Sequence, residues 1–231
     1  MWCIIPAAGI GLRMSSDVPK QYIKLDNNEF ILDTTIDRVL ASGVVNNIML
    51  PINTNDNHWQ KSKYYNDNRV TTCFGGDTRA QSVLNGLKAI KLSVKNDDFV
   101  MVHDAARCCV LPTEISKLYS IIDISESIGG ILAAPINDTV KVVNPLEIIS
   151  ETKCRKMLWM AHTPQVFTYK ILMQSIESAL ERGVEVTDES SAVEAFGYSP
   201  RVILGSKMNI KVTHPEDIKL ANLYLNLEIE K

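Results

Sequence analysis

Short apolar runs alternate with segments of helical periodicity along this chain, and this alternation constrains the fold more than any other feature. The runs typical of buried strands are Trp2–Pro6, Asn47–Ile52, Val70–Phe74, Phe99–Val102, Ile131–Ala134 and Val202–Leu204. Between them, apolar residues recur at helical spacing, for example at Val83, Leu87 and Ile90. Repeated strand–helix alternation predicts an α/β fold with a mostly parallel sheet and right-handed crossovers.

The 231 residues are enough for one sizeable core, and we expect a single domain over residues 1–231. The formal net charge is −3, so the chain has no broad basic field to follow a nucleic-acid backbone. No apolar run approaches the ~20 residues that span a bilayer. The first residues, MWCIIPAAG, are too few and too poor in basic residues for a signal peptide. A cytoplasmic location without a membrane partner is therefore expected.

The five cysteines are an odd number without Cys-x-x-Cys spacing, which argues against a disulfide framework or a structural zinc site. Adjacent Cys108 and Cys109 are either a redox or metal site, or two small apolar residues packed under a loop.

Residues 136–158 contain two strand-like pieces around Asn144–Pro145 and no helix between them. This pattern predicts a hairpin arm that projects from the domain. Its valines, among them Val140, Val142 and Val143, need a cover, and a partner subunit would provide one.

Polar or glycine-containing clusters follow several of the predicted strands. They comprise residues 9–20, 75–82, 103–107 and 209–213. Because ligands bind at the carboxyl ends of the strands in such sheets, we expect these distant clusters to meet at one edge.

The first cluster, PAAGIGLRMSSDVPKQY, is not a dinucleotide fingerprint, since Met14 occupies the third glycine position. It is not a Walker loop either, since it does not end in Gly-Lys-Ser/Thr. Arg13 and Lys20 beside bare backbone amides suit a triphosphate. The alternative is that both are solvated surface charges.

The second and third clusters, GGDTRAQS and VHDAAR, add candidate polar groups. Asp77 is a candidate ribose ligand or a helix cap, and Ser82 follows one turn later. Asp104 is a candidate Mg²⁺ or ribose ligand, or a helix cap. His103 is expected to be a packed histidine.

Two lysines and one helix start complete the candidates. Lys141 and Lys211 are candidate phosphate ligands or solvated lysines. Thr187, at the start of a predicted helix, offers a hydroxyl and amides to an anion, or begins an ordinary capped helix.

Seven motifs occur together in a fixed order: PAAGIGLRM…PKQY, GGDTRAQSV, VHDAAR, GGILAAPINDTVK, LWMAHTPQVF, TDESSAVE and NIKVTHPEDI. In this combination the chain closely resembles the 2-C-methyl-D-erythritol 4-phosphate cytidylyltransferase family, from Trp2 to about Leu225. The resemblance implies a Rossmann-like nucleotidyltransferase fold and a homodimer with exchanged arms of about residues 136–158. It also implies a reaction of CTP with a polyol phosphate, dependent on Mg²⁺, that releases pyrophosphate.

The resemblance also assigns roles to residues. Arg13 and Lys20 would stabilise the transition state, and Lys211 and Arg155 would position the polyol phosphate. The substrate-binding residues would be Thr139, Ala7, Ala8, Gly9, Gly76, Asp77, Ser82, Asp104, Ala105, Arg107, Thr163 and Thr187. Asp104 would also lie near the metal.

The departures from the family pattern are Cys108, where proline is usual, Lys156–Met157 after Arg155 of the arm, and His214, where arginine is common. A ribitol-5-phosphate cytidylyltransferase is the nearest alternative, although its first loop and arm motifs usually differ from PAAG and APxxDTVK. A nucleotide-binding regulator without activity is the other alternative, and pyrophosphate release would distinguish it from both enzymes.

Overall fold

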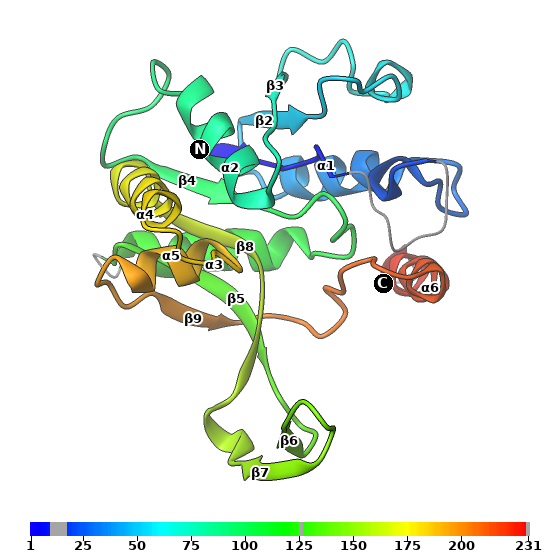
Figure 1. The fold of residues 1–231 in the computed structure, drawn as a ribbon. Helices are drawn as coiled ribbons and strands as arrows, with labels where there is room; N and C mark the ends of the chain where they lie inside the picture. Colours follow the sequence, from blue (N-terminus) through cyan, green and yellow to red (C-terminus); the bar gives the residue numbers. More distant parts are fainter. Residues whose placement is uncertain (10–17, 125–126, 230–231) are drawn as a thin grey trace.

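A computed structural model describes residues 1–9, 18–124 and 127–229, and its centre is one twisted sheet (Figure 1). The strands lie in the order β3-β2-β1-β4-β8-β5-β9. Their bounds are β1 (Trp2–Ile4), β2 (Asn47–Ile52), β3 (Val70–Phe74), β4 (Phe99–Val102), β5 (Gly129–Pro135), β8 (Trp159–Thr168) and β9 (Arg201–Leu204). Neighbouring strands are parallel except where β8 pairs with β4 and β5. The predicted α/β fold with a mostly parallel sheet is confirmed.

Helices cover both faces of the sheet because its strands carry apolar side chains on both sides. Helices α1 (Ile31–Ala41) and α3 (Pro112–Ile124) share one core with Cys3 of β1. Helices α2 (Arg79–Ala89), α4 (Tyr169–Glu181) and α5 (Glu189–Ala195) share the other core with Ile4. Consecutive residues of one strand thus pack into opposite cores, as the pleat of a strand requires.

The C-terminal helix α6 (Pro215–Ile229) covers a third, smaller cluster. Cys108 and Cys109 are fully buried there, with their sulfur atoms 4.0 Å apart, and the Cys109 thiol points to the carbonyl of Ala221. This arrangement agrees with the packing interpretation of the cysteine pair.

Helix α1 does not begin at Asp33, although aspartate is a residue type that often caps helices. Phe30 occupies the N-cap position, and Asp33 lies within the first turn of the helix. The buried Asp33 carboxylate accepts a hydrogen bond from the Ser62 hydroxyl at 2.5 Å. A tertiary partner, not a helix end, therefore satisfies this aspartate.

The predicted arm is present as an antiparallel hairpin of β6 (Val140–Val143) and β7 (Ile149–Lys153), followed by the short 3₁₀ helix η4 (Arg155–Met157). It extends from the body on two long chain segments (Figure 1). Large apolar side chains are exposed on it: Val143, Leu146, Ile148, Ile149 and Met157.

Strand β8 leads from the arm back into the middle of the sheet, and the sequence patterns did not predict it. Its pairing with β5 is irregular, because Ala133 faces Ala161 whereas Ile131 faces Gln165. Three residues of β8, 162–164, therefore lie opposite the single residue 132. Such a bulge redirects side chains locally.

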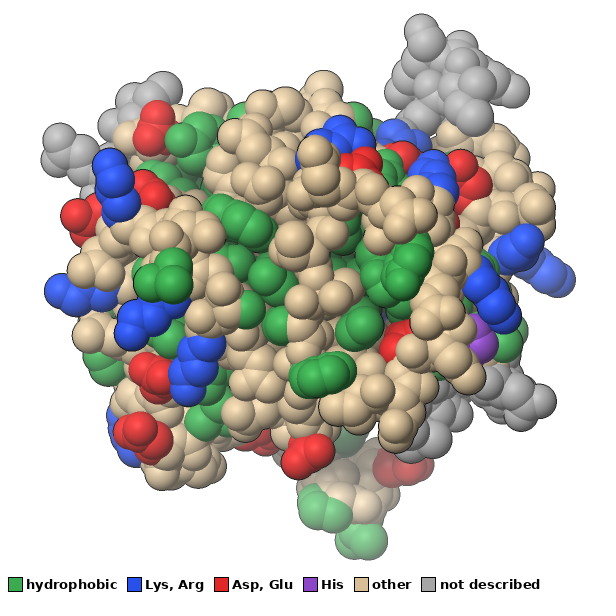
Figure 2. Space-filling model, turned by 90° about the horizontal axis from the view of Figure 1, so that it is seen from above, with side chains coloured by type: hydrophobic (Ala, Val, Ile, Leu, Met, Phe, Trp, Pro, Cys, Tyr) green, Lys and Arg blue, Asp and Glu red, His purple; other side chains and the backbone are tan. Residues whose placement is uncertain are grey.

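The outer surface mixes charges of both signs. On the face in Figure 2, Lys and Arg side chains are interspersed with Asp and Glu around a largely uncharged centre. None of the helices in the described ranges is long and apolar enough to cross a bilayer.

Candidate active site

A cavity of about 680 Å³ opens at the carboxyl ends of β1, β3 and β4. The four clusters that follow predicted strands meet there, as the sheet topology led us to expect. The predicted residues that line it are Ala7, Ala8, Gly9, Lys20, Gly76, Asp77, Ser82, Asp104, Ala105 and Lys211. We call this cavity the first pocket.

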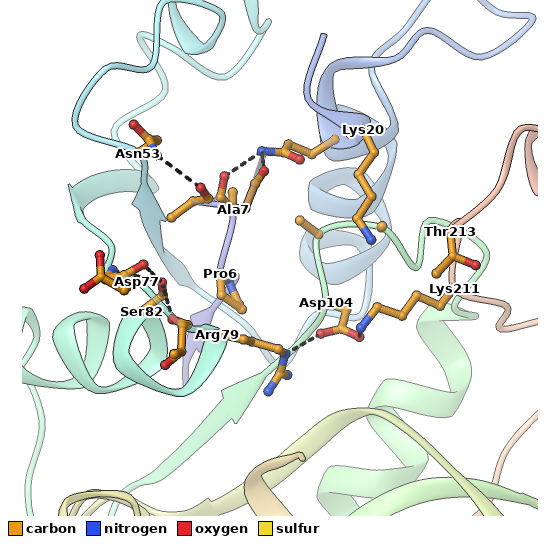
Figure 3. Close-up of a pocket in the computed structure, with 17 residues that line it drawn as sticks. Pro6, Ala7, Lys20, Asn53, Asp77, Arg79, Ser82, Asp104, Lys211 and Thr213 are labelled. Atoms are coloured by element: carbon orange, nitrogen blue, oxygen red, sulfur yellow. Dashed lines mark hydrogen bonds and ion pairs between the residues drawn. The ribbon is translucent and has the colours of Figure 1, made fainter. Parts of the chain in front are cut away.

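One wall of the first pocket is the backbone that follows β1. The buried side-chain amide of Gln21 donates hydrogen bonds to the carbonyl groups of Ala7 (2.6 Å) and Gly9 (3.0 Å). The Asn53 amide donates to the carbonyl of Ala8 at 3.4 Å (Figure 3). These two amides fix the path of the backbone, and sequence reasoning missed both residues.

The opposite wall is the loop between β3 and α2. The amide of Gly76 donates to the Ser82 hydroxyl at 3.0 Å, and that hydroxyl donates to the carbonyl of Thr78. Asp77 lines the pocket but does not cap α2, because Thr78 holds the N-cap position and accepts from the amide of Gln81.

Three cations surround the buried carboxylate of Asp104 at the floor of the first pocket. Arg79 donates from Nε to Oδ1 at 2.8 Å. The ammonium group of Lys211 lies 2.8 Å from Oδ2, and Nε of Arg107 lies 3.5 Å from the same oxygen. Burial would raise the pKa of this carboxyl, but attraction to the three cations outweighs burial and lowers the pKa well below its ordinary value.

The same Arg79 guanidinium reaches a second carboxylate. Its Nη1 and Nη2 donate to the two carboxylate oxygens of Glu189 at 2.7 and 3.0 Å. Glu189 is fully buried at the first position of α5. The pair joins residues 110 positions apart in the chain, and the sequence patterns did not indicate it.

A second pocket of about 240 Å³ adjoins the first. It is lined by Arg79, Asp104, Arg107, Ala161, His162, Thr163, Gln165, Thr187, Asp188 and Lys211. Since Arg79, Asp104 and Lys211 line both pockets, they form the junction between the two.

Strand β8 organises the second pocket. The Thr163 hydroxyl accepts a hydrogen bond from the amide of Asp104 at 2.9 Å. Gln165 donates to the carboxylate of Asp188 (2.8 Å) and accepts from the amide of Ser190 (2.8 Å). The start of α5 is thereby fixed to the sheet next to the cations.

Two buried histidines flank these groups. Burial lowers the pKa of His103 to about 4 and that of His162 to about 4, so both rings are neutral at pH 7. Nε2 of His103 lies 3.1 Å from the carbonyl oxygen of Arg107, and Nδ1 lies 3.0 Å from the Thr163 hydroxyl. His103 is thus packed and hydrogen-bonded, as the sequence predicted.

The remaining candidates lie in three places. Lys20, in the short helix η2 (Lys20–Tyr22), points into the first pocket with Lys211 (Figure 3), and its ammonium group is 3.3 Å from the carbonyl oxygen of Val212. Thr139 and Arg155 are exposed on the arm, outside the lining of both pockets. Arg13 lies outside the described residues.

The candidate cation site at Asp104 does not have the surroundings of a metal ligand. Both of its oxygens face Arg79, Lys211 or Arg107, and no group of three or more acidic, histidine or cysteine side chains able to hold a metal ion occurs among the described residues. Positive neighbours repel Mg²⁺, so the geometry favours a carboxylate that holds cationic side chains in place.

Comparisons with known proteins identify the family to which the chain is similar. The family model described as IspD, 2-C-methyl-D-erythritol 4-phosphate cytidylyltransferase, matches residues 1–227. A protein of that name from Aliivibrio fischeri (strain MJ11) is 43% identical over 222 residues, which cover 96% of this chain and 92% of the relative. A protein of the same name from Buchnera aphidicola is 43% identical over 227 residues, which cover 98% of this chain and 93% of the relative.

Solved structures give the same picture. The crystal structure of the Francisella tularensis 2-C-methyl-D-erythritol 4-phosphate cytidylyltransferase matches with a TM-score of 0.84 and 41% identity. That match covers 96% of this chain and 98% of the other.

Proposed function

Because this chain belongs to the 2-C-methyl-D-erythritol 4-phosphate cytidylyltransferase family, we propose that its two adjoining pockets hold the two substrates of the family reaction. The chain is a nucleotidyltransferase that uses CTP. Its products are pyrophosphate and 4-diphosphocytidyl-2-C-methyl-D-erythritol. The relatives are named for methylerythritol phosphate, so a ribitol phosphate substrate is not favoured.

The junction of the two pockets supports this assignment, because Arg79 and Lys211 place fixed positive charge where two bound phosphates would meet. CTP fits the first pocket, because the small residues Ala7, Ala8 and Gly76 leave backbone groups within reach of a pyrimidine edge. The polyol phosphate fits the second pocket, where Arg107 and Lys211 offer positive charge. The acceptor phosphate would then face the α-phosphate of CTP across the junction.

In the reaction, an anionic oxygen of the polyol phosphate attacks the α-phosphorus of CTP, and the bond from that phosphorus to the bridging oxygen of pyrophosphate breaks. The nucleophile is already ionised, so no general base is needed. The barrier comes from bringing two anions together and holding them in line. Lys20 and Lys211 point toward this place, and fixed cations there stabilise the charge that accumulates around phosphorus. Arg13 would act with them, as its motif predicts.

We propose that the divalent cation of the reaction binds to the nucleotide. Asp104 is engaged by cationic side chains, so we expect Mg²⁺ to bind the phosphate oxygens of CTP and not this carboxylate.

The arm would complete the second pocket of a neighbouring subunit. Thr139 and Arg155 are exposed on a hairpin that lies away from the body of its own chain, among apolar side chains that a partner would cover. A homodimer with exchanged arms would bring Arg155 to the partner's acceptor phosphate.

Pyrophosphate release tests the function. CTP with methylerythritol phosphate should give rapid release, and UTP, ATP or ribitol phosphate should give much less. Equal rates with all three nucleotides would contradict the base assignment, and no release with either polyol phosphate would favour a nucleotide-binding regulator.

A mixed dimer tests the exchange of arms. Arg155→Ala and Lys20→Ala chains, each inactive alone, should regain part of the activity when mixed, because one of the two sites then carries neither change. If heterodimers form and activity stays absent, each arm serves its own subunit.

A further inference from the structure

We propose that the Arg79–Glu189 ion pair is a positioning device that ties the acceptor side of the site to the nucleotide side. This inference rests on the proposed function, since it assigns the two pockets to the two substrates. Neither residue is among those that the family resemblance assigned.

The position of Arg79 in its own helix does not favour a positive charge. Arg79 is the first residue of α2, directly after the N-cap Thr78. A cation at a helix N-terminus is opposed by the helix dipole. Its guanidinium therefore depends on the carboxylates of Glu189 and Asp104, which together accept three of its hydrogen bonds.

Glu189 is equally dependent on Arg79. It is fully buried, and an unpaired carboxylate there would carry a large desolvation penalty. The planar fork of arginine matches both carboxylate oxygens and fixes the orientation as well as the distance. Since Glu189 follows Thr187 and Asp188, which line the second pocket, the pair also sets where these two residues lie.

The same guanidinium determines how Asp104 presents its charge. Arg79 occupies Oδ1, so Oδ2 remains for Lys211 and Arg107. The three cations (Arg79, Arg107 and Lys211) and the two carboxylates (Asp104 and Glu189) carry a formal net charge of +1. This positive charge lies where two phosphates would meet. A displacement of Arg79 would therefore move the acceptor-binding loop and the Lys211 ammonium together.

The first test is the kinetics of Glu189→Gln, a change that keeps the size of the side chain and removes its charge. We expect the KM for the polyol phosphate to rise about 10- to 10²-fold, because ångström-scale misplacement has effects of this size. The KM for CTP should stay within about twofold, since most of the first pocket does not depend on Glu189. A merely structural role would lower the melting temperature and the active fraction without changing either KM.

Glu177→Gln is the matched control. Glu177 pairs with Lys88 at 3.1 Å, so this variant breaks another ion pair of the same helix α2, outside both pockets. Both KM values should be unchanged in it.

Arg79→Lys is the second variant and covers the case that Glu189→Gln does not fold. The Arg79 side chain is partly exposed, and lysine keeps the charge but loses the fork. We again expect a raised KM for the polyol phosphate and an almost unchanged KM for CTP. In the double variant, which carries both Glu189→Gln and Arg79→Lys, the KM for the polyol phosphate should be no higher than in the more strongly affected single variant. This is expected because the two residues act as a unit.

An unchanged KM for the polyol phosphate in a folded variant, or effects that multiply in the double variant, would overturn the inference. Failure of the proposed function is a separate result: the unmodified chain would then release no pyrophosphate.

Discussion

Gly75→Ala should impair CTP binding, because this glycine separates the two walls of the first pocket. A Cβ atom at position 75 would lie 2.4 Å from Cβ of Ala8 and 2.9 Å from the Ser82 hydroxyl. Two carbon atoms in contact normally stay about 3.5–4.0 Å apart, so one wall must move by roughly 1 Å or more. Ala8 and Ser82 both line the pocket, and the displacement therefore enters the nucleotide site.

A misplacement of this size should raise the KM for CTP by about 10- to 10²-fold. The assay is pyrophosphate release at saturating polyol phosphate over a range of CTP concentrations, with a thermal melt of the same preparation. Gly205→Ala is the matched control, because its new Cβ would lie 3.3 Å from Leu132 and outside both pockets. A folded Gly75→Ala protein with an unchanged KM for CTP would refute the placement of the nucleotide between these walls.

Three further predictions concern charge at the site. Lys20→Ala should lower kcat by ~10²–10³-fold with little change in melting temperature, and near-normal turnover would make Lys20 a surface charge. Asp104→Asn should raise the KM for the polyol phosphate but leave the Mg²⁺ concentration for half-maximal activity unchanged; a shift of that concentration would make Asp104 a metal ligand. His103 and His162 have folded pKa values of about 4, below the 6.5 of an unperturbed histidine, so between these values the unfolded chain binds protons that the folded chain excludes. The free energy of unfolding should therefore fall as the pH drops from about 6.5 to 4, by up to about 1.4 kcal/mol per pH unit for each histidine. Urea unfolding at pH 7 and pH 5 should show a smaller loss in His162→Gln than in the unmodified chain, and equal losses would contradict the assignment.

The meeting of distant clusters at one edge could be predicted from the sequence because parallel strands end on the same side of a sheet. Ala7, Gly76, Asp104 and Lys211 lie in four separate segments, yet all line one pocket. To predict that these four residues meet, it was enough to know which segments of the chain are strands.

The contacts that hold these clusters in place could not be predicted in the same way. Arg79 and Glu189 are 110 residues apart, and neither residue stands in a local pattern that indicates the other. Asp33 shows the same limit, since aspartate is a common helix cap but this one accepts a hydrogen bond from the distant Ser62. Strand β8 was missed because it runs antiparallel to its neighbours and no α-helix lies between it and β7. This breaks the strand–helix alternation used to find the other strands.

The bulge in β8 has a consequence for how the length of this chain can vary. On one side of residues 162–164, β8 is matched to β5 at Ala161; on the other side it is matched at Gln165. Residues can be added at the hairpin tip, between β6 and β7, without shifting either match. A change of one residue between 159 and 165 inverts the side chains on one side of the bulge, whereas a change of two preserves their faces. Where the arm joins the site, an insertion or deletion is therefore limited more by whether its number of residues is odd or even than by its length.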